Sequence, residues 1–171
     1  MLSRRPAVAA AVAVVALAAL VSLVGCGGGQ TKAARTARYR AEATVVFAAV
    51  IQAVGVKNKV ERADAPSGVV LTVPRWFRPQ GTYSMADATG EQYMLEDGSI
   101  LLRHEIRVVG GDGEYKVEVI PHIAQMRSGY AQPIPLKPDD LAVPGWVHGR
   151  TDSLYLEIYE RLKEYEVKPG T

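Results

Sequence analysis

One pair of alternating segments, joined by a glycine-rich turn, constrains the fold more than any other feature of the chain. Residues 100–123 read ILLRHEIRVVGGDGEYKVEVIPHI, with apolar side chains at every second position on both sides of the glycines. Such alternation is typical of two antiparallel strands with one buried face. A turn at Gly111-Asp112 sets His104 opposite Val119 on the apolar face. A slip by one residue would turn both apolar sets outward, so the pattern predicts a hairpin whose apolar face is covered.

Further strand signals flank this hairpin. The stretch YMLEDGSILL, residues 93–102, predicts a second turn at Asp97-Gly98, which sets Leu95 opposite the first residue of the hairpin. Toward the amino terminus, a turn over 64–68 separates an extended run from the β-branched run 69–73. Together these segments predict an antiparallel β-meander of about four to five strands.

A helical pattern precedes the strands. Apolar side chains at positions i, i+3, i+4 and i+7 are Phe47, Val50, Ile51 and Val54. Gly55 is expected to end this helix. The helix starts either near Lys32 or near Thr44, in the second case with RYRAE extended before it.

A second helical pattern, TDSLYLEIYERLKEYE, follows the strands at residues 151–166. Thr151 or Asp152 can cap it. Its apolar stripe consists of Leu154, Tyr155, Ile158, Leu162 and Tyr165. Two such helices can cover one face of the antiparallel sheet, which predicts an α+β two-layer sandwich.

Composition and charge indicate a globular chain. Of 171 residues, 48% are hydrophobic and 22% charged, which suits one domain with an appendage. There are 20 Lys and Arg against 18 Asp and Glu, and Arg4 and Arg5 fall within residues 1–25. Residues 26–171 are therefore neutral, which argues against nucleic-acid binding.

The amino terminus has the pattern of an export signal. A cationic start, MLSRR, precedes an uncharged apolar run that ends at Cys26, the single cysteine. The sequence Leu23-Val24-Gly25-Cys26 resembles the lipobox of bacterial lipoproteins. That resemblance implies cleavage before Cys26 and a diacylglycerol on its thiol, which would anchor the chain to a membrane. The alternative is an uncleaved membrane anchor.

The predicted organisation follows from this signal. Residues 1–25 are the signal peptide, 26–42 a lipidated cysteine with a flexible basic tether, and 43–171 a single α+β domain. The tether carries four basic side chains before the first acid, namely Lys32, Arg35, Arg38 and Arg40. They either contact anionic headgroups or form a solvated surface.

The order of motifs in the body of the chain suggests a family resemblance. VFAAVIQAV, ADAPSGVVLTV and RHEIRVVGGDGEYKVEV follow one another between residues 40 and 166. This order resembles the helix-grip domains of small bacterial envelope lipoproteins, including the BamC type. The resemblance implies a helix, a curved antiparallel meander and a closing helix, and a binding or scaffolding role in the envelope.

Two tryptophan-containing segments are the candidate binding surface. Each tryptophan lies beside arginines, in PRWFRP and in PGWVHGR, within stretches that are expected to be loops. Trp and Arg are enriched where proteins bind partners. The candidate residues are Arg75, Trp76, Phe77, Arg78, Trp146, His148 and Arg150. Alternatively, at least one indole ring packs back against the end of the sandwich.

The sequence contains few patterns that indicate catalysis or metal binding. No nucleophile motif is present, and His104 and His122 fall on opposite faces of the hairpin, so we expect no metal site and no cofactor. His104 is expected to be a core histidine bonded to backbone. The sequence favours a membrane-anchored, non-catalytic module that binds a ligand or an envelope protein. The alternative is a glycan-acting hydrolase that uses Asp87, Glu91 or Asp139.

Overall fold

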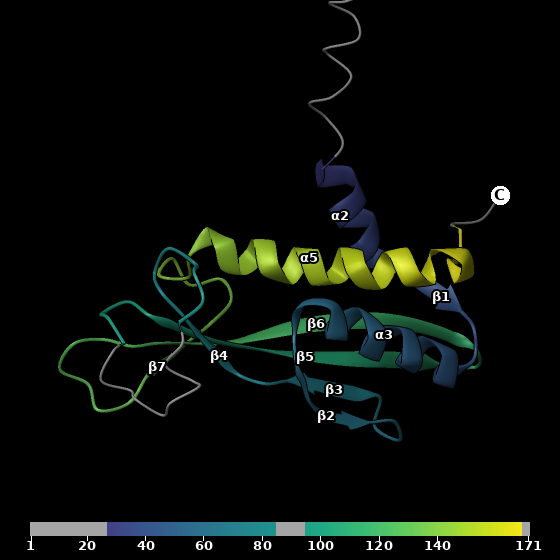
Figure 1. The fold of residues 1–171 in the computed structure, drawn as a ribbon. Coiled ribbons are helices and arrows are strands. Elements are labelled where there is room, and N and C mark those ends of the chain that lie inside the picture. The colour runs from purple at the N-terminus through teal and green to yellow at the C-terminus, as the bar shows by residue number, and fades with distance from the viewer. Residues whose placement is uncertain (1–26, 85–94, 169–171) are drawn as a thin grey trace, which may run out of the picture.

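A computed structural model describes residues 27–84 and 95–168 (Figure 1). The signal peptide, Cys26 and the acids Asp87 and Glu91 lie outside these residues. The elements are α2 (Gly27–Thr36), β1 (Arg38–Arg40), α3 (Ala43–Lys57), β2 (Val60–Asp64), β3 (Val69–Thr72), β4 (Arg75–Phe77), β5 (Ile100–Gly111), β6 (Glu114–Gln125), β7 (Ile134–Leu136) and α5 (Gly145–Leu162), followed by a 3-10 turn over Lys163–Tyr165.

The predicted α+β class is confirmed. An antiparallel sheet has the strand order β1-β6-β5-β3-β2, with β4 also paired to β5 and β7 to β6. Helices α3 and α5 lie across one face of the sheet, and α2 packs on α5 (Figure 1). The described residues thus form seven strands and three helices, more than the predicted four to five strands and two helices.

The central hairpin has the predicted faces but a different register. Its turn is Asp112-Gly113, so His104 lies opposite Pro121 rather than Val119. The two turn residues have φ of 52° and 80°, as a type I′ turn requires. The predicted and observed registers differ by two residues. Because side chains alternate with a period of two, the same residues remain on the buried face.

This turn gives a direct prediction. Gly113→Ala places a side chain in the left-handed region with open space around it, so only backbone strain opposes it. We expect a loss of about 1 kcal/mol in the free energy of unfolding, measured by urea titration. Gly111→Ala is the matched control, because it also meets open space and is not among the residues with positive φ. Equal effects of the two substitutions would contradict the turn assignment.

The predicted turn at Asp97-Gly98 is present, with the N–H of Ser99 donating to the carbonyl oxygen of Glu96 at 3.0 Å, but the strand pairing predicted across it is wrong. Ile100 lies opposite Phe77 of β4, not opposite Leu95, and Tyr93 falls outside the described residues. The N–H of Gly98 donates to the carbonyl oxygen of Met126 at 2.9 Å, which ties the turn to the end of β6 instead. The place beside β5 is therefore taken by β3 and β4.

One extra residue separates β3 from β4 along β5. Leu71 of β3 pairs with Glu105, and Arg75 of β4 pairs with Leu102. Three residues between the two pairs therefore oppose two on β5, which is a β-bulge. Because side chains alternate, the bulge turns Arg75 to the helix-covered face, where Leu102 is buried.

Local hydrogen bonding accommodates this bulge. Pro74 has no N–H and cannot donate to the ladder. The N–H of His104 instead donates to the hydroxyl oxygen of Thr72 at 2.9 Å. Downstream, Phe77 shares the helix-covered face with Arg75, whereas Trp76 points to the opposite side of β4.

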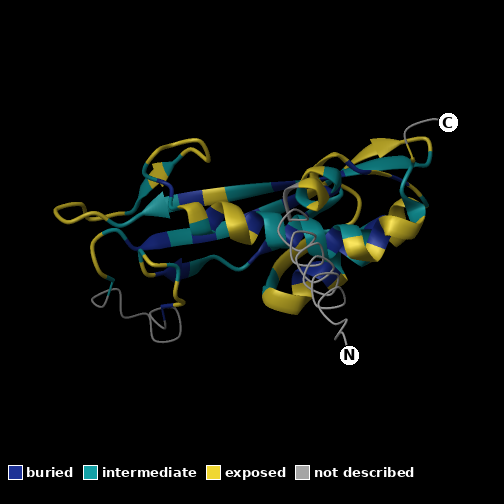
Figure 2. Ribbon diagram, turned by 90° about the horizontal axis from the view of Figure 1, so that it is seen from above, coloured by how far each residue is buried: buried dark blue, intermediate teal, exposed yellow. Residues whose placement is uncertain are grey.

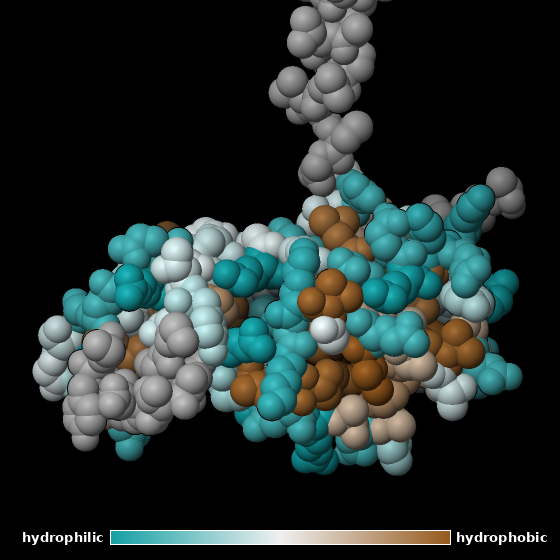
Figure 3. Space-filling view, in the orientation of Figure 1, coloured by the Kyte–Doolittle hydropathy of each residue, from teal (hydrophilic) through white to brown (hydrophobic). Residues whose placement is uncertain are grey.

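Of the two predicted starts of the first long helix, the one near Thr44 is correct. RYR forms strand β1, and the helix begins at Ala43 and continues through Gly55 to Lys57. Its buried residues are Val46, Val50, Ala53 and Val54. The outer side of α3 is apolar as well, with Val45 and Val56 exposed (Figure 3). Because α3 is apolar on almost every side, the apolar pattern of its sequence does not show where the helix ends. This explains why its end was wrongly predicted at Gly55.

Helix α5 begins earlier than predicted. It starts at Gly145, directly after Pro144, so neither Thr151 nor Asp152 caps it. Thr151 is buried within the helix, where its hydroxyl donates to the carbonyl oxygen of Val147 at 3.1 Å. The predicted apolar stripe is correct along its centre, where Leu154, Ile158 and Leu162 are buried (Figure 2).

The amino-terminal segment is part of the domain. Residues 27–42 form α2 and β1, so the predicted flexible tether over 26–42 is wrong for this stretch. Ala34 of α2 is buried, Arg35 forms an ion pair with Asp152 of α5, and Tyr39 is only 1% exposed. The small apolar side chains of this segment pack, and packing outweighs the flexibility that its glycines suggested.

The three arginines of this segment have acidic partners. Besides the Arg35 pair, Arg38 and Arg40 both lie within ion-pair distance of Glu114. These contacts favour the solvated-surface alternative, and membrane contact stays a prediction. In the described part of the chain, no helix combines the length and apolar character needed to cross a bilayer.

Within residues 27–84 and 95–168, the core consists of two clusters. The larger joins α3, α5 and the β5–β6 centre and includes Val50, Ile106 and Ile158. The smaller lies at the other end of the sheet and includes Phe77 and Val147.

Candidate ligand-binding site

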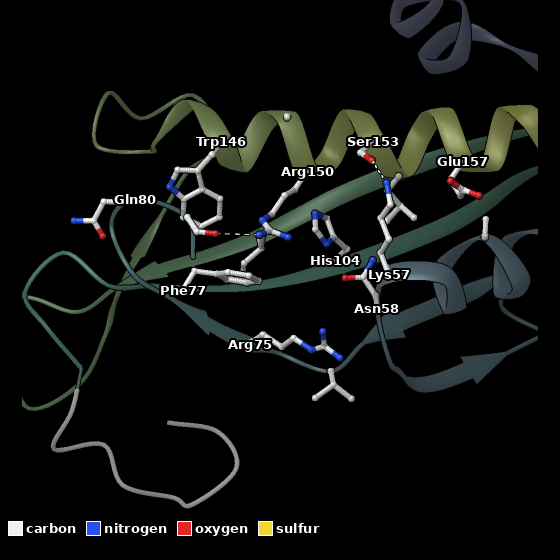
Figure 4. Close-up of a pocket in the computed structure, with 16 residues that line it drawn as sticks. Lys57, Asn58, Arg75, Phe77, Gln80, His104, Trp146, Arg150, Ser153 and Glu157 are labelled. Atoms are coloured by element: carbon white, nitrogen blue, oxygen red, sulfur yellow. Dashed lines mark hydrogen bonds between the residues drawn. The ribbon is translucent and has the colours of Figure 1, made fainter. Parts of the chain in front are cut away.

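A pocket of about 420 Å³ opens where the two core clusters meet, beneath α5 (Figure 4). This volume is within the range of small-molecule sites. The pocket is bounded by the end of α3, the β3–β4 bulge, β5 and the loop after β4. The residues that line it are Ala53, Lys57, Asn58, Val73, Arg75, Phe77, Gln80, Gly81, Leu102, His104, Trp146, Gly149, Arg150, Ser153, Leu154 and Glu157.

Aromatic rings form one end of the pocket. Phe77 and Trp146 lie with ring centroids 5.3 Å apart, and the indole N–H donates to the carbonyl oxygen of Pro79 at 2.8 Å. Gly81 supports this arrangement with φ of 87°, and a Cβ there would lie 2.8 Å from Cγ of Trp146. Only glycine allows the loop to approach the indole so closely.

Two arginines belong to the pocket wall. Arg150 of α5 donates to the carbonyl oxygen of Gly81 at 3.0 Å, and its guanidinium carbon lies 4.4 Å from the centroid of the Phe77 ring. Arg75 of β4 lies 5.6 Å from the centroid of Tyr83. Burial, and then the positive charge of Arg75, lower the pKa of Arg150. The two cations are therefore close enough to repel one another.

His104 lies in the pocket wall between sheet and helix. It is 4% exposed, and its Nε2 lies 3.2 Å from the hydroxyl oxygen of Thr151. Because that hydroxyl donates to Val147, it accepts from His104, which assigns the ring proton to Nε2. The expected backbone partner is thus replaced by a side-chain hydroxyl. Burial, followed by the charges of Arg150 and His122, lowers the pKa of His104 to about 4.

The other end of the pocket is polar. Lys57, the last residue of α3, donates to the hydroxyl of Ser153 at 2.9 Å. Glu157 lies one turn further along α5 (Figure 4), and its carboxylate is 3.7 Å from Arg161. A single carboxylate therefore lies among the described lining residues.

The structure brings four of the seven predicted site residues together. Arg75, Phe77, Trp146 and Arg150 line the pocket. Of the other three, Trp76 is buried on the opposite side of β4, so for this indole the packing alternative holds. Arg78 pairs with Glu96 at 3.9 Å, and His148 is exposed on α5 outside the lining.

Several lining residues were missed by the sequence analysis. Ser153 and Glu157 follow the predicted Trp146 at helical spacing, and only a helix that starts at Gly145 places all three on one side. Lys57 was missed because α3 was expected to end at Gly55. In each case, a prediction of the longer helix would have placed these residues at the pocket.

The described residues do not bring together the carboxylates that the alternative hydrolase would need. Asp139 follows β7 and is not part of the pocket lining, and Asp87 and Glu91 lie outside the described residues. No group of three or more His, Cys, Asp or Glu residues within 27–84 and 95–168 is placed to hold a metal ion. Comparison with protein-family models and with curated proteins found no match for this chain.

Proposed function

We propose that this chain is an exported, lipid-anchored binding protein of the bacterial envelope whose α+β domain holds a small ligand without transforming it. The pocket beneath α5 is the observation that carries this proposal. It combines a ligand-sized volume, apolar and aromatic walls and a few polar groups, which is the usual composition of small-molecule sites.

The groups in the pocket suit binding better than catalysis. His104 uses Nε2 for a structural hydrogen bond and stays neutral near pH 7, as its pKa of about 4 requires. Glu157 has no second carboxylate beside it among the described lining residues, so the paired acids of a glycosidase are not assembled there. No observation specifically favours the hydrolase alternative.

The two tryptophans provide a test of binding. The chain contains two indole groups. Trp146 lines the pocket, and Trp76 lies on the other side of β4 and serves as the internal reference. The full chain in phosphatidylcholine nanodiscs is titrated with three naphthalene probes of equal shape: naphthalene-2-carboxylate, naphthalene-2-methanol and naphthalene-2-methylammonium. The indole ¹⁵N–¹H signals are followed, assigned with Trp146→Phe.

We expect at least one probe to shift the Trp146 signal saturably and to leave the Trp76 signal in place. Ser153→Phe, which places a ring at the pocket wall, should abolish the shift. Glu164→Phe, on an exposed residue after α5, should not. Failure of all three probes to shift the Trp146 signal would overturn the binding function.

The anchor is tested separately. Cys26→Ser removes the thiol that the lipobox pattern assigns to lipidation. Two acyl chains hold a protein on a bilayer far more firmly than one, so the unsubstituted chain should stay in the membrane fraction with the added mass of a diacylglycerol. The variant should lack that mass on intact-mass analysis. An unmodified Cys26 with residues 1–25 still attached would disprove the lipoprotein assignment.

A further inference from the structure

Among the described residues, the cations of the pocket have no acidic partners. Lys57, Arg75 and Arg150 line it, and none of them forms an ion pair with a described residue. Apart from Arg127, all other described arginines lie within ion-pair distance of Asp or Glu, namely Arg35, Arg38, Arg40, Arg62, Arg78, Arg103, Arg107 and Arg161. The pocket therefore gathers two arginines without an acidic partner, whereas most of the other described arginines have one.

Both arginines are held in place by neutral groups. The guanidinium of Arg150 stacks on Phe77, contacts the Trp146 ring at 5.7 Å and donates one N–H to Gly81. Arg75 is steadied by the Tyr83 ring. Stacking on a ring occupies the flat face of a guanidinium and leaves N–H groups at its edge free to bind an oxyanion in a bidentate manner.

The free pocket is electrostatically unfavourable. Partial desolvation of Arg150, and then the positive charge of Arg75, lower the pKa of Arg150, although Arg150 is exposed and Arg75 is half-buried. Like charges held close together without a counter-ion repel one another. An anion between them would relieve the repulsion and replace the lost hydration with charge-assisted hydrogen bonds.

The remaining walls of the pocket require a ligand with an apolar body. Phe77, Leu102, Trp146 and Leu154 line the pocket, and the neutral His104 adds no charge (Figure 4). Glu157 is the single acid of the described lining, and it lies at the Lys57 end, beside Arg161. The arginine and aromatic side of the pocket is thus positive and apolar at once.

We propose that the ligand is a small oxyanion on an apolar body, such as an aromatic or short aliphatic carboxylate or phosphate, whose anionic group binds between Arg75 and Arg150. This assignment rests on the proposed binding function. It depends on the β3–β4 bulge, which brings Arg75 to the same face as the α5 arginine.

The naphthalene titration described above distinguishes this ligand class. Naphthalene-2-carboxylate should bind about tenfold or more tightly than naphthalene-2-methanol, because charge-assisted hydrogen bonds replace neutral ones. Naphthalene-2-methylammonium should bind more weakly than either. Arg75→Gln and Arg150→Gln should each weaken carboxylate binding about tenfold and change binding of the neutral probe by less than about twofold.

The controls separate a local loss of charge from damage to the fold. Arg78→Gln removes an arginine on the same segment but outside the pocket lining, and should leave carboxylate binding unchanged. Retained binding of naphthalene-2-methanol shows that each pocket variant keeps its shape. Arg75→Lys should recover only part of the affinity, since an ammonium cannot bind an oxyanion in a bidentate manner.

The possible outcomes are distinct. Equal affinity for carboxylate and methanol probes, or preference for the ammonium probe, would overturn the ligand class while leaving the binding function intact. Absence of binding by every probe would overturn the binding function itself. Titration with 2-naphthyl phosphate then compares the two oxyanions: tighter binding than the carboxylate assigns a phosphate ligand, and weaker binding assigns a carboxylate.

Discussion

Lowering the pH from 7 to 4 is expected to cost the folded chain about 3 kcal/mol through His104 alone. The folded-state pKa of this residue is about 4, against an ordinary value of 6.5. Above pH 6.5 the ring is neutral in both the folded and the unfolded chain. As the pH falls below 6.5, His104 takes up a proton in the unfolded chain but stays neutral in the folded chain. The free energy of unfolding therefore decreases until the folded ring also protonates near pH 4.

Urea titrations at several pH values measure this loss. His104→Gln should flatten the dependence of the free energy of unfolding on pH between 6.5 and 4, whatever its effect at pH 7. His148→Gln is the control, because it removes an exposed imidazole on α5 and leaves the buried ring of His104 in place. Parallel curves for the unsubstituted chain and His104→Gln would show that the ring is not held neutral by burial.

Ile106→Ala is expected to lower the free energy of unfolding by about 3 kcal/mol or more. Ile106 is fully buried on β5, where it lies opposite Val70 and Val119 and belongs to the larger core cluster under the helices. Truncation removes apolar contacts and leaves a cavity that the surrounding strands cannot close.

The matched control lies on the same strand. Val109 is 47% exposed, so Val109→Ala should change the free energy of unfolding by less than about 0.5 kcal/mol. Chemical unfolding of both variants at pH 7 gives the comparison. A loss below about 1 kcal/mol for Ile106→Ala would mean that the helices do not cover this face as described.

The sequence predicts the faces of the fold better than its register. Alternation identifies which residues of the β5–β6 hairpin are buried, because a period of two is unaffected by a two-residue shift. The register itself depends on which dipeptide accepts positive φ at both positions, and Asp112-Gly113 does so. The flanking glycines offered more than one place for the turn.

Helix ends and the amino-terminal segment were less predictable. Thr151 has the side chain of a capping residue, yet in α5 its hydroxyl donates to the carbonyl oxygen of Val147 and accepts a hydrogen bond from His104. That role exists only once the sheet is in place beneath the helix. Likewise, the three glycines of α2 suggest a flexible tether, whereas contacts with α5 made after folding determine the conformation.

Four of the sixteen lining residues could be predicted from composition, but their assembly into one pocket could not. Trp and Arg marked the two segments that meet in the pocket, but nothing local shows that Phe77 and Trp76 point to opposite sides of β4. That distinction follows from pairing with a strand more than twenty residues away.

The bulge between Thr72 and Arg75 determines which side of β4 carries the charge. If the same residues continued the β3 ladder without a bulge, Arg75 would lie opposite Leu101 instead of Leu102, and the two sides of β4 would be exchanged. Trp76 would then face α5, and Arg75 would leave the pocket. Deleting one residue between Leu71 and Arg75 would instead keep Arg75 opposite Leu102, so proteins with this fold and a connection one residue shorter should present the same side chains to the helix.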